Sequence, residues 1–188
     1  MNAKRNVTVA AVGVCLGALL IVSQTAGSNR GHQPFKLGGA WIMKFQGNPT
    51  TCMVTDAPDA SGRRAAVSGT TVIGDPTLGG AFLEAQWQSP VMGEAVVTGW
   101  DRGAFTVVQY GLKPGAAGLP EIVYIIVDSG TFKEIGPGKT EHQHNAAVYL
   151  PFQDADGDGL PDEGQAPVAC VPMTSLETRV SLLPPCTP

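Results

Sequence analysis

The chain has 188 residues, with 12 Lys or Arg against 16 Asp or Glu and a formal net charge of −4. Charged residues make up only 15% of it, while 24 glycines and 15 prolines interrupt it, and this composition argues against long amphipathic helices. The sequence has no basic stripe interleaved with aromatic residues. Nucleic acid is therefore excluded as an expected partner.

Residues 1–28 have the pattern of a secretory signal peptide. Lys4 and Arg5 form a charged start, Val7–Val22 is apolar and uncharged, and small residues around Gly27 suit cleavage. The apolar run is short for a membrane span, so no stable span is expected after cleavage, with an uncleaved anchor as the alternative. The pattern predicts a secreted or periplasmic protein, whose roughly 160 mature residues fit one domain.

Short segments rich in apolar and β-branched residues recur along the rest of the chain, with turn residues between them. Residues 29–38 are predicted to be a flexible leader and residues 39–153 a mostly β domain. Short turns, such as those at Asp59–Gly62, Asp128–Gly130 and Gly136–Gly138, make consecutive strands neighbours in an antiparallel meander. We predict a barrel of about eight strands, with a β-sandwich as the alternative. The expected strands are Ala40–Gln46, Thr51–Thr55, Arg64–Ile73, Val91–Trp100, Ala104–Leu112, Ile122–Asp128, Thr131–Ile135 and Lys139–Leu150.

Gly39-Ala40-Trp41 opens the first expected strand. This Gly-x-Trp resembles the start of the first strand in lipocalins and other calycin barrels. The resemblance implies a closed barrel in an exported bacterial protein, with Trp41 closing one end beneath an arginine from near the C-terminus. Arg179 is the candidate for that arginine. The interior of such a barrel is either filled by side chains or holds one small ligand.

Aspartates and glycines alternate through residues 154–162. Carboxylates at loop positions one, three and five, followed by Gly159 at the sharp bend, suit a single Ca²⁺ ion, which takes six to eight oxygen ligands. The expected ligands are Asp154, Asp156, Asp158, Asp162 and the backbone carbonyl of Leu160.

The flanks of this run differ from an EF-hand. Gln165 stands where the bidentate Glu would be, and Pro151 and Pro161 oppose flanking helices. The run resembles the loops of thrombospondin type 3 repeats and bacterial EF-hand-like proteins. Residues 154–165 are therefore predicted to be a structural calcium loop with a dissociation constant on the order of 10⁻⁴ M. A solvated acidic turn is the alternative.

Three cysteines follow the signal segment: Cys52, Cys170 and Cys186. An oxidising compartment favours a disulfide between two of them. A Cys170–Cys186 bond would close the Pro-rich tail at residues 166–188 and contribute roughly 3 kcal/mol of stability. The alternative joins Cys52 to one of the tail cysteines.

His142 and His144 lie two positions apart on the last expected strand, so they share one face and stand about 7 Å apart. Such a pair could hold a catalytic metal with a third ligand, or do acid–base work in a cavity with Glu94. Asp128 and Glu134 are further candidates for the third group. The simpler interpretation is that both histidines are polar lining or core residues.

Together these features favour an exported, calcium-stabilised β-barrel with a non-catalytic binding or structural role. Its expected partner is a small apolar ligand or an extracellular or cell-surface molecule. The alternative is a small-barrel enzyme of the cyclase, isomerase or hydrolase kind, or a small-ligand carrier, with His142 and His144 lining the cavity. No nucleophile elbow, phosphate loop or dinucleotide fingerprint supports an enzyme class.

Overall fold

A computed structural model describes residues 35–47, 50–73 and 85–181. The predicted signal peptide at 1–28, most of the predicted leader and Cys186 lie outside these residues. Within the described ranges, no helix is long and apolar enough to cross a membrane.

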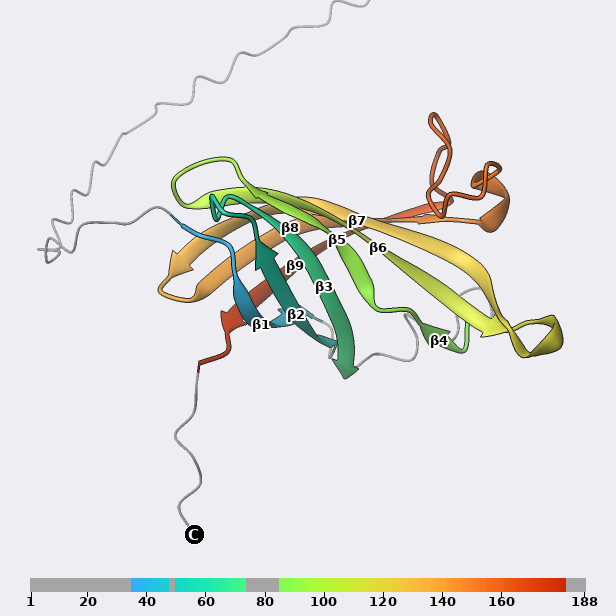
Figure 1. The fold of residues 1–188 in the computed structure, drawn as a ribbon, viewed down its shortest axis with the longest axis horizontal. Coiled ribbons are helices and arrows are strands. Elements are labelled where there is room, and N and C mark those ends of the chain that lie inside the picture. Colours follow the sequence, from blue (N-terminus) through green and yellow to red (C-terminus); the bar gives the residue numbers. More distant parts are fainter. Residues whose placement is uncertain (1–34, 48–49, 74–84, 182–188) are drawn as a thin grey trace, which may run out of the picture. The chain divides into compact units, whose positions relative to one another are not determined.

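The described residues form nine strands and two short 3₁₀ helices, η1 (Ala116–Gly118) and η2 (Pro151–Gln153). The strands are β1 (Gly39–Phe45), β2 (Thr51–Pro58), β3 (Arg64–Ile73), β4 (Trp87–Gln88), β5 (Val91–Val97), β6 (Arg102–Pro114), β7 (Pro120–Gly136), β8 (Lys139–Tyr149) and β9 (Ala169–Arg179). Their arrangement is shown in Figure 1.

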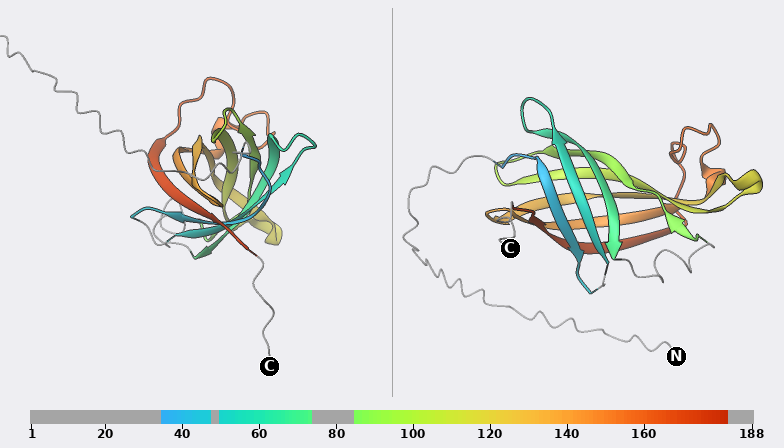
Figure 2. Two further views of the ribbon diagram at one scale, coloured as in Figure 1. Left: turned by 90° about the vertical axis from the view of Figure 1, so that its left-hand side faces the viewer. Right: turned by 60° about the horizontal axis from the view of Figure 1, so that its bottom comes forward.

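Eight of these strands close into an antiparallel barrel. Each long strand pairs with the next one along the chain, and β9 pairs back to β1, while the two-residue β4 adds to the edge of β6. Figure 2 shows the strands arranged around the barrel in its left view. The prediction of a mostly β, eight-stranded meander barrel is confirmed, and a β-sandwich is excluded. Closure leaves no long unpaired edges, which is how up-and-down barrels avoid edge pairing.

The alternation of side chains explains how this sequence builds a barrel wall. Along β8, Thr140, His142, His144, Ala146 and Val148 are buried, while the residues between them are half-buried or exposed. This period of two is that of a strand with one covered face. The face that the sequence predicted for the two histidines is therefore the inner face of the barrel.

The predicted turn at Asp128–Gly130 is wrong, because β7 runs unbroken through it. These three residues pair with β6 on one side and with β8 on the other. Asp128 faces the interior and finds a partner there in His144. A Cβ on Gly130 would stand 2.5 Å from the Cβ of His144, so the glycine gives this histidine space instead of making a turn.

The predicted Pro-rich tail also needs correction, because residues 169–179 within it form β9, the strand that closes the barrel. The barrel therefore extends to Arg179 and does not end at residue 153. Pro172 lies inside β9, where β8 pairs with it but β1 does not, since β1 pairs only from Ser175 onward. An edge without a partner tolerates the missing N–H of a proline.

The loop between β8 and β9 is fastened to the barrel by a buried glutamine. Gln153 is 4% exposed; its amide oxygen accepts the Leu150 N–H at 2.9 Å and its amide nitrogen donates to the Ala166 carbonyl at 2.8 Å. These bonds join the two ends of the loop. The Tyr110 hydroxyl of β6 donates to the Gly159 carbonyl at 3.0 Å, which holds the middle of the loop near the β6–β7 hairpin.

Candidate functional site

A cavity of about 290 Å³ lies inside the barrel and is lined by side chains from every strand. Most of its lining is apolar. The aromatic lining residues are Phe35, Trp41, Phe45, Phe105, Tyr124 and Phe132. The polar lining residues include Asp56, Asp128, Thr140, His142 and Glu177. The interior is therefore hollow and mainly apolar, with a small number of polar groups.

One end of the cavity is closed by Trp41, which is 2% exposed. The guanidinium carbon of Arg179 lies 5.0 Å from the centre of the Trp41 ring, and the guanidinium donates to the carbonyl of Gly38. Gly39 has a φ of 108°, and a Cβ there would stand 3.1 Å from Nε of Arg179. The Phe35 ring also packs against Trp41, with the two ring centres 6.4 Å apart. The arginine-over-tryptophan contact expected from the lipocalin resemblance is present.

Beside this closed end, His142 forms a buried polar cluster with Thr140 and Glu177. Nε2 of His142 lies 3.0 Å from Oε2 of Glu177 and 2.9 Å from Oγ1 of Thr140, and the Thr140 hydroxyl donates to the same carboxylate at 3.3 Å. Because a carboxylate only accepts, this contact places the proton on Nε2 and leaves Nδ1 as an acceptor when the ring is neutral. Nδ1 of His142 is buried without a protein partner.

Asp56 of β2 adds a second carboxylate to the same end of the cavity. Burial, followed by the nearby charge of Glu177, raises the pKa of the Asp56 carboxyl to about 6. Hydrogen bonding from the Gly38 backbone N–H and the Trp41 side chain, and the charge of His142, oppose this rise only in part. Burial and the neighbouring negative charge of Glu177 therefore disfavour the ionised form of Asp56 in the folded protein.

A second histidine–carboxylate pair lies farther along β8. Nδ1 of His144 contacts both carboxylate oxygens of Asp128, at 2.7 and 2.9 Å, and the His144 side chain is fully buried. Its Nε2 has no protein partner. The Phe105 ring lies 5.5 Å from the His142 ring and 5.8 Å from the His144 ring, so both imidazoles border the same aromatic surface.

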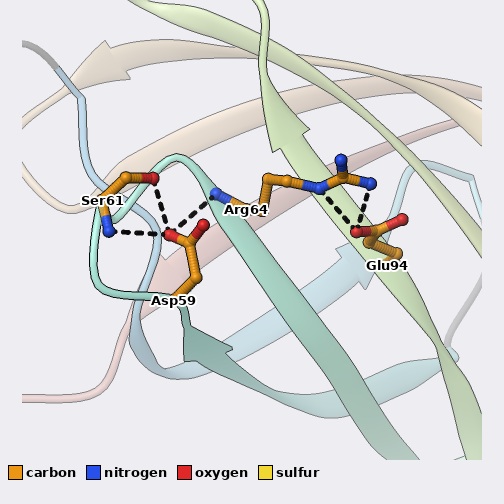
Figure 3. A network of polar contacts seen from close by, with 4 residues as sticks. All are labelled: Asp59, Ser61, Arg64 and Glu94. Carbon is orange, nitrogen blue, oxygen red and sulfur yellow. Dashed lines mark hydrogen bonds and ion pairs between the residues drawn. The ribbon is translucent and has the colours of Figure 1, made fainter.

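The third predicted candidate, Glu94, is not part of this site. It lies on the outer face of β5, where its carboxylate binds Arg64 at 2.7 Å and both side chains are more than half exposed. Figure 3 shows this pair beside the Asp59 turn, where hydrogen bonding from the Ser61 hydroxyl lowers the pKa of Asp59. Among the residues predicted to join the histidines as a third ligand or acid–base group, Asp128 is the one that contacts a histidine, His144. Neither histidine joins a convergent trio of metal-ligating side chains among the described residues.

The aspartate loop does contain such a trio. Ligand oxygens of Asp154, Asp156 and Asp162 lie within 4.8 Å of one another. Oδ1 of Asp154 is buried without a protein partner. Asp158, predicted as a ligand, is not in the trio; its carboxylate accepts the Leu160 N–H at 2.8 Å. The donor set consists of hard oxygens, which fits Ca²⁺.

Cys52 and Cys170 lie on different faces of the barrel wall. Cys52 lines the cavity, whereas Cys170 is exposed on β9. A bond between these two would have to pass through the wall, so the alternative pairing of Cys52 with Cys170 is disfavoured. The predicted Cys170–Cys186 bond stays a prediction because Cys186 is outside the described residues.

Sequence reasoning missed Asp56, Glu177 and Ser175. Ser175 is fully buried, pairs in register with His142, and has a hydroxyl without a protein partner. Asp56 sits two residues after Val54 and Glu177 two after Ser175, so each continues the inner face of its strand. Strand periodicity would have found Asp56 if β2 had been extended beyond Thr55, but β9 itself was not predicted.

Comparisons with known proteins give little beyond the fold. No protein-family model matches the chain, and no curated protein matches it. One solved structure with some likeness is titled "Structure of EF1p2_mFAP2b bound to DFHBI"; it is 17% identical, with a TM-score of 0.39, and the match covers 77% of this chain and 94% of that one. The likeness is too distant to support an argument, and the barrel is established by its own strand pairing.

Proposed function

We propose that the protein is a non-catalytic binding module that holds a small, largely apolar molecule inside its barrel. The observation that carries this proposal is the cavity of about 290 Å³, lined mainly by apolar and aromatic side chains with a few polar groups. Ligand sites commonly combine an apolar lining with a small number of orienting polar groups. The unpartnered Nδ1 of His142, which lines the cavity, is available for that orientation.

The volume limits the size of the ligand. Liquid water occupies about 30 Å³ per molecule, so the cavity corresponds to on the order of ten to twenty non-hydrogen atoms of ligand. Small-molecule sites have volumes upward of roughly 300 Å³. The volume of this cavity is therefore near the lower end of their range. A compact aromatic or short aliphatic compound fits these limits, while a long lipid chain does not.

Filling the cavity should weaken ligand binding strongly. We expect Ala146→Phe to weaken the binding of a neutral apolar reporter, N-phenylnaphthylamine, by at least tenfold, because Ala146 lines the cavity and the added ring occupies the ligand's space. The measurement is a titration that follows the fluorescence gain of the reporter in an apolar environment.

Ala147→Phe is the matched control. It makes the same substitution one residue along β8, on the opposite face of the strand, where the side chain is half-buried in the outer wall. Reporter affinity should stay within about twofold of the unchanged protein. Equal effects of the two variants, or no binding by the unchanged protein, would sink the proposal.

We further propose that the protein acts outside the cytoplasm and that Ca²⁺ stabilises its β8–β9 loop. The signal-like pattern of residues 1–28 supports export. The convergence of three aspartates, with a buried unpartnered oxygen on Asp154, supports a cation in the loop. A weak site of this kind fills only where calcium is abundant, as it is outside cells.

Calcium should raise the melting temperature. At a free Ca²⁺ concentration about 100 times the dissociation constant, binding to the folded state alone stabilises it by about 2.7 kcal/mol. For a protein of this size that corresponds to about 5–10 °C. Thermal unfolding in Ca²⁺ and in EGTA measures the gain, and Asp154→Asn with Asp156→Asn should remove it.

Glu163→Gln controls for this pair of substitutions, because it removes one negative charge from an exposed side chain beside Asp162. It should keep the calcium response. A melting temperature that is the same in Ca²⁺ and in EGTA would contradict the calcium proposal and leave the binding proposal intact.

An enzyme of the small-barrel kind remains the second candidate function, and one observation favours it. The His144–Asp128 pair leaves Nε2 of a buried histidine without a partner, and a histidine oriented by a carboxylate is a common general base. Mass spectrometry of a bound compound before and after incubation separates the two functions. A binding module returns the compound unchanged, while an enzyme converts it.

A further inference from the structure

The charged groups of the cavity are unevenly balanced. Three carboxylates, those of Asp56, Asp128 and Glu177, line it, and no lysine or arginine is among its lining within the described residues. Buried carboxylates are costly unless they are paired with a positive group or well hydrogen bonded. Within the described residues, His142 is the only lining side chain that can carry a positive charge.

The imbalance lies at the closed end. His144 and Asp128 form a pair that is neutral overall when the imidazole is protonated. His142, in contrast, is shared by two carboxylates, since it binds Glu177 and also acts on Asp56. This cluster keeps at least one negative charge when Asp56 and Glu177 are ionised, even with His142 protonated. Burial, followed by the charge of Glu177, raises the pKa of the Asp56 carboxyl, which agrees with this excess of negative charge.

Arg179 does not fill this role. It is absent from the cavity lining, its guanidinium lies over the Trp41 ring, and it donates to the Gly38 carbonyl. The closed end therefore combines uncompensated negative charge with an arginine that is engaged elsewhere.

Aromatic faces surround the rest of the cluster. Trp41, Phe105 and Phe132 all line the cavity, and the rings of Phe105 and Phe132 lie 5.5 and 5.7 Å from the His142 ring. Aromatic faces attract cations, more strongly where water is excluded. The same lining accommodates an apolar body and favours a positive charge attached to it.

We propose that the ligand is an amphipathic organic cation, a compact apolar amine whose ammonium group binds between Asp56 and Glu177. This inference rests on the proposed binding function and names its ligand class. The ammonium supplies the positive charge that the two carboxylates lack and donates hydrogen bonds to them. Its hydrocarbon body lies against the aromatic and aliphatic lining toward the middle of the barrel.

A matched series of probes tests the charge requirement. Phenethylamine, phenethyl alcohol and phenylacetate share one phenyl ring and one short chain, but carry a positive, a neutral and a negative group. Each is titrated into the full chain holding N-phenylnaphthylamine, at neutral pH. We expect the amine to displace the reporter at a concentration at least tenfold lower than the alcohol, and the carboxylate to be the weakest of the three.

Two variants locate the preference. Asp56→Asn and Glu177→Gln should each reduce the preference for amine over alcohol to threefold or less while leaving alcohol binding nearly unchanged. Asp56→Asn should fold, because it removes a charge that the folded protein disfavours. Glu94→Gln, an equal change of charge on the outer wall, should keep the full preference.

The outcomes separate this inference from the binding function on which it rests. If the reporter and all three probes fail to bind, the binding function is wrong. If the alcohol binds as well as the amine, or the carboxylate binds best, the binding function stands and the cation inference is overturned. An amine preference that survives both Asp56→Asn and Glu177→Gln overturns the assigned position of the ammonium.

Discussion

Replacing Trp41 by alanine should destabilise the protein by about 3–5 kcal/mol, the range for removal of a buried large aromatic side chain. Trp41 is 2% exposed and belongs to the core cluster at the closed end. Its removal also takes away the ring beneath Arg179 and one of the rings that Phe35 contacts. Neighbouring side chains cannot fill the space, because the cavity already lies on the inner side. Chemical denaturation with urea measures the loss.

Trp87→Ala is the control for this substitution. Trp87 is 42% exposed on the short strand β4, so its truncation should cost less than about 1 kcal/mol. Similar losses for the two variants, or a loss below about 1 kcal/mol for Trp41→Ala, would show that the closed end is not the anchor that the structure describes. Arg179→Ala should give a smaller loss than Trp41→Ala, because it removes one cation–π contact and one hydrogen bond.

Breaking the His144–Asp128 pair should cost a similar amount of folding stability to the loss of Trp41. Removing one member of a buried, hydrogen-bonded histidine–carboxylate pair should cost about 3–5 kcal/mol, because the remaining group loses its partner inside the protein. His144 is fully buried, and 16% of the Asp128 side chain is exposed. We therefore expect His144→Ala to fall within this range and Asp128→Ala, with some access to water, to cost less.

A double-mutant cycle gives the sharper measurement. The two substitutions together should cost less than the sum of the single losses by at least about 1 kcal/mol, because the second one removes a group that the first had already left unpaired. Gln143→Ala, on the exposed face of β8 beside His144, should change stability by less than about 0.5 kcal/mol. Strict additivity of the two losses would show that the contact contributes nothing.

Periodicity in the sequence was enough to predict the fold class. The segments Arg64–Ile73 and Lys139–Leu150 alternate or run apolar between clear turns, and both are strands with nearly the predicted bounds. The turns at Asp59–Gly62 and Gly136–Gly138 lie where expected, and Gly62 and Gly138 have φ values of 68° and 67° there. At these positions local conformational preference and the tertiary fold agree.

The predictions were wrong where a residue typical of turns or loops has another role in the tertiary structure. Asp128 and Gly130 look like turn residues, yet one binds a histidine inside the barrel and the other gives that histidine space. Pro172 looks like a feature of a loose tail, yet it lies in a strand next to an unpaired edge. The predicted count of eight strands was right although one strand was divided in two and β9 was missed. Only the pairing of β9 with β1 and β8 reveals its place.

The candidate site was predictable in part. The shared face of His142 and His144 follows from strand periodicity alone, and the structure places both rings inside the barrel. Their carboxylate partners come from β7 and β9, and no sequence spacing relates Glu177 to His142 on the neighbouring strand. Glu94 was a reasonable candidate by charge, but its position on β5 directs it outward to Arg64. Which face a residue occupies depends on register, and register is fixed by pairing.

The most direct test of the binding function is a crystal structure of the full chain grown with phenethyl alcohol, the neutral probe. The structure predicts electron density for the alcohol inside the barrel, between the aromatic lining at Phe105 and the closed end at Trp41. Density for the alcohol only on the outer surface, or an interior packed full by side chains from the surrounding strands, would contradict it.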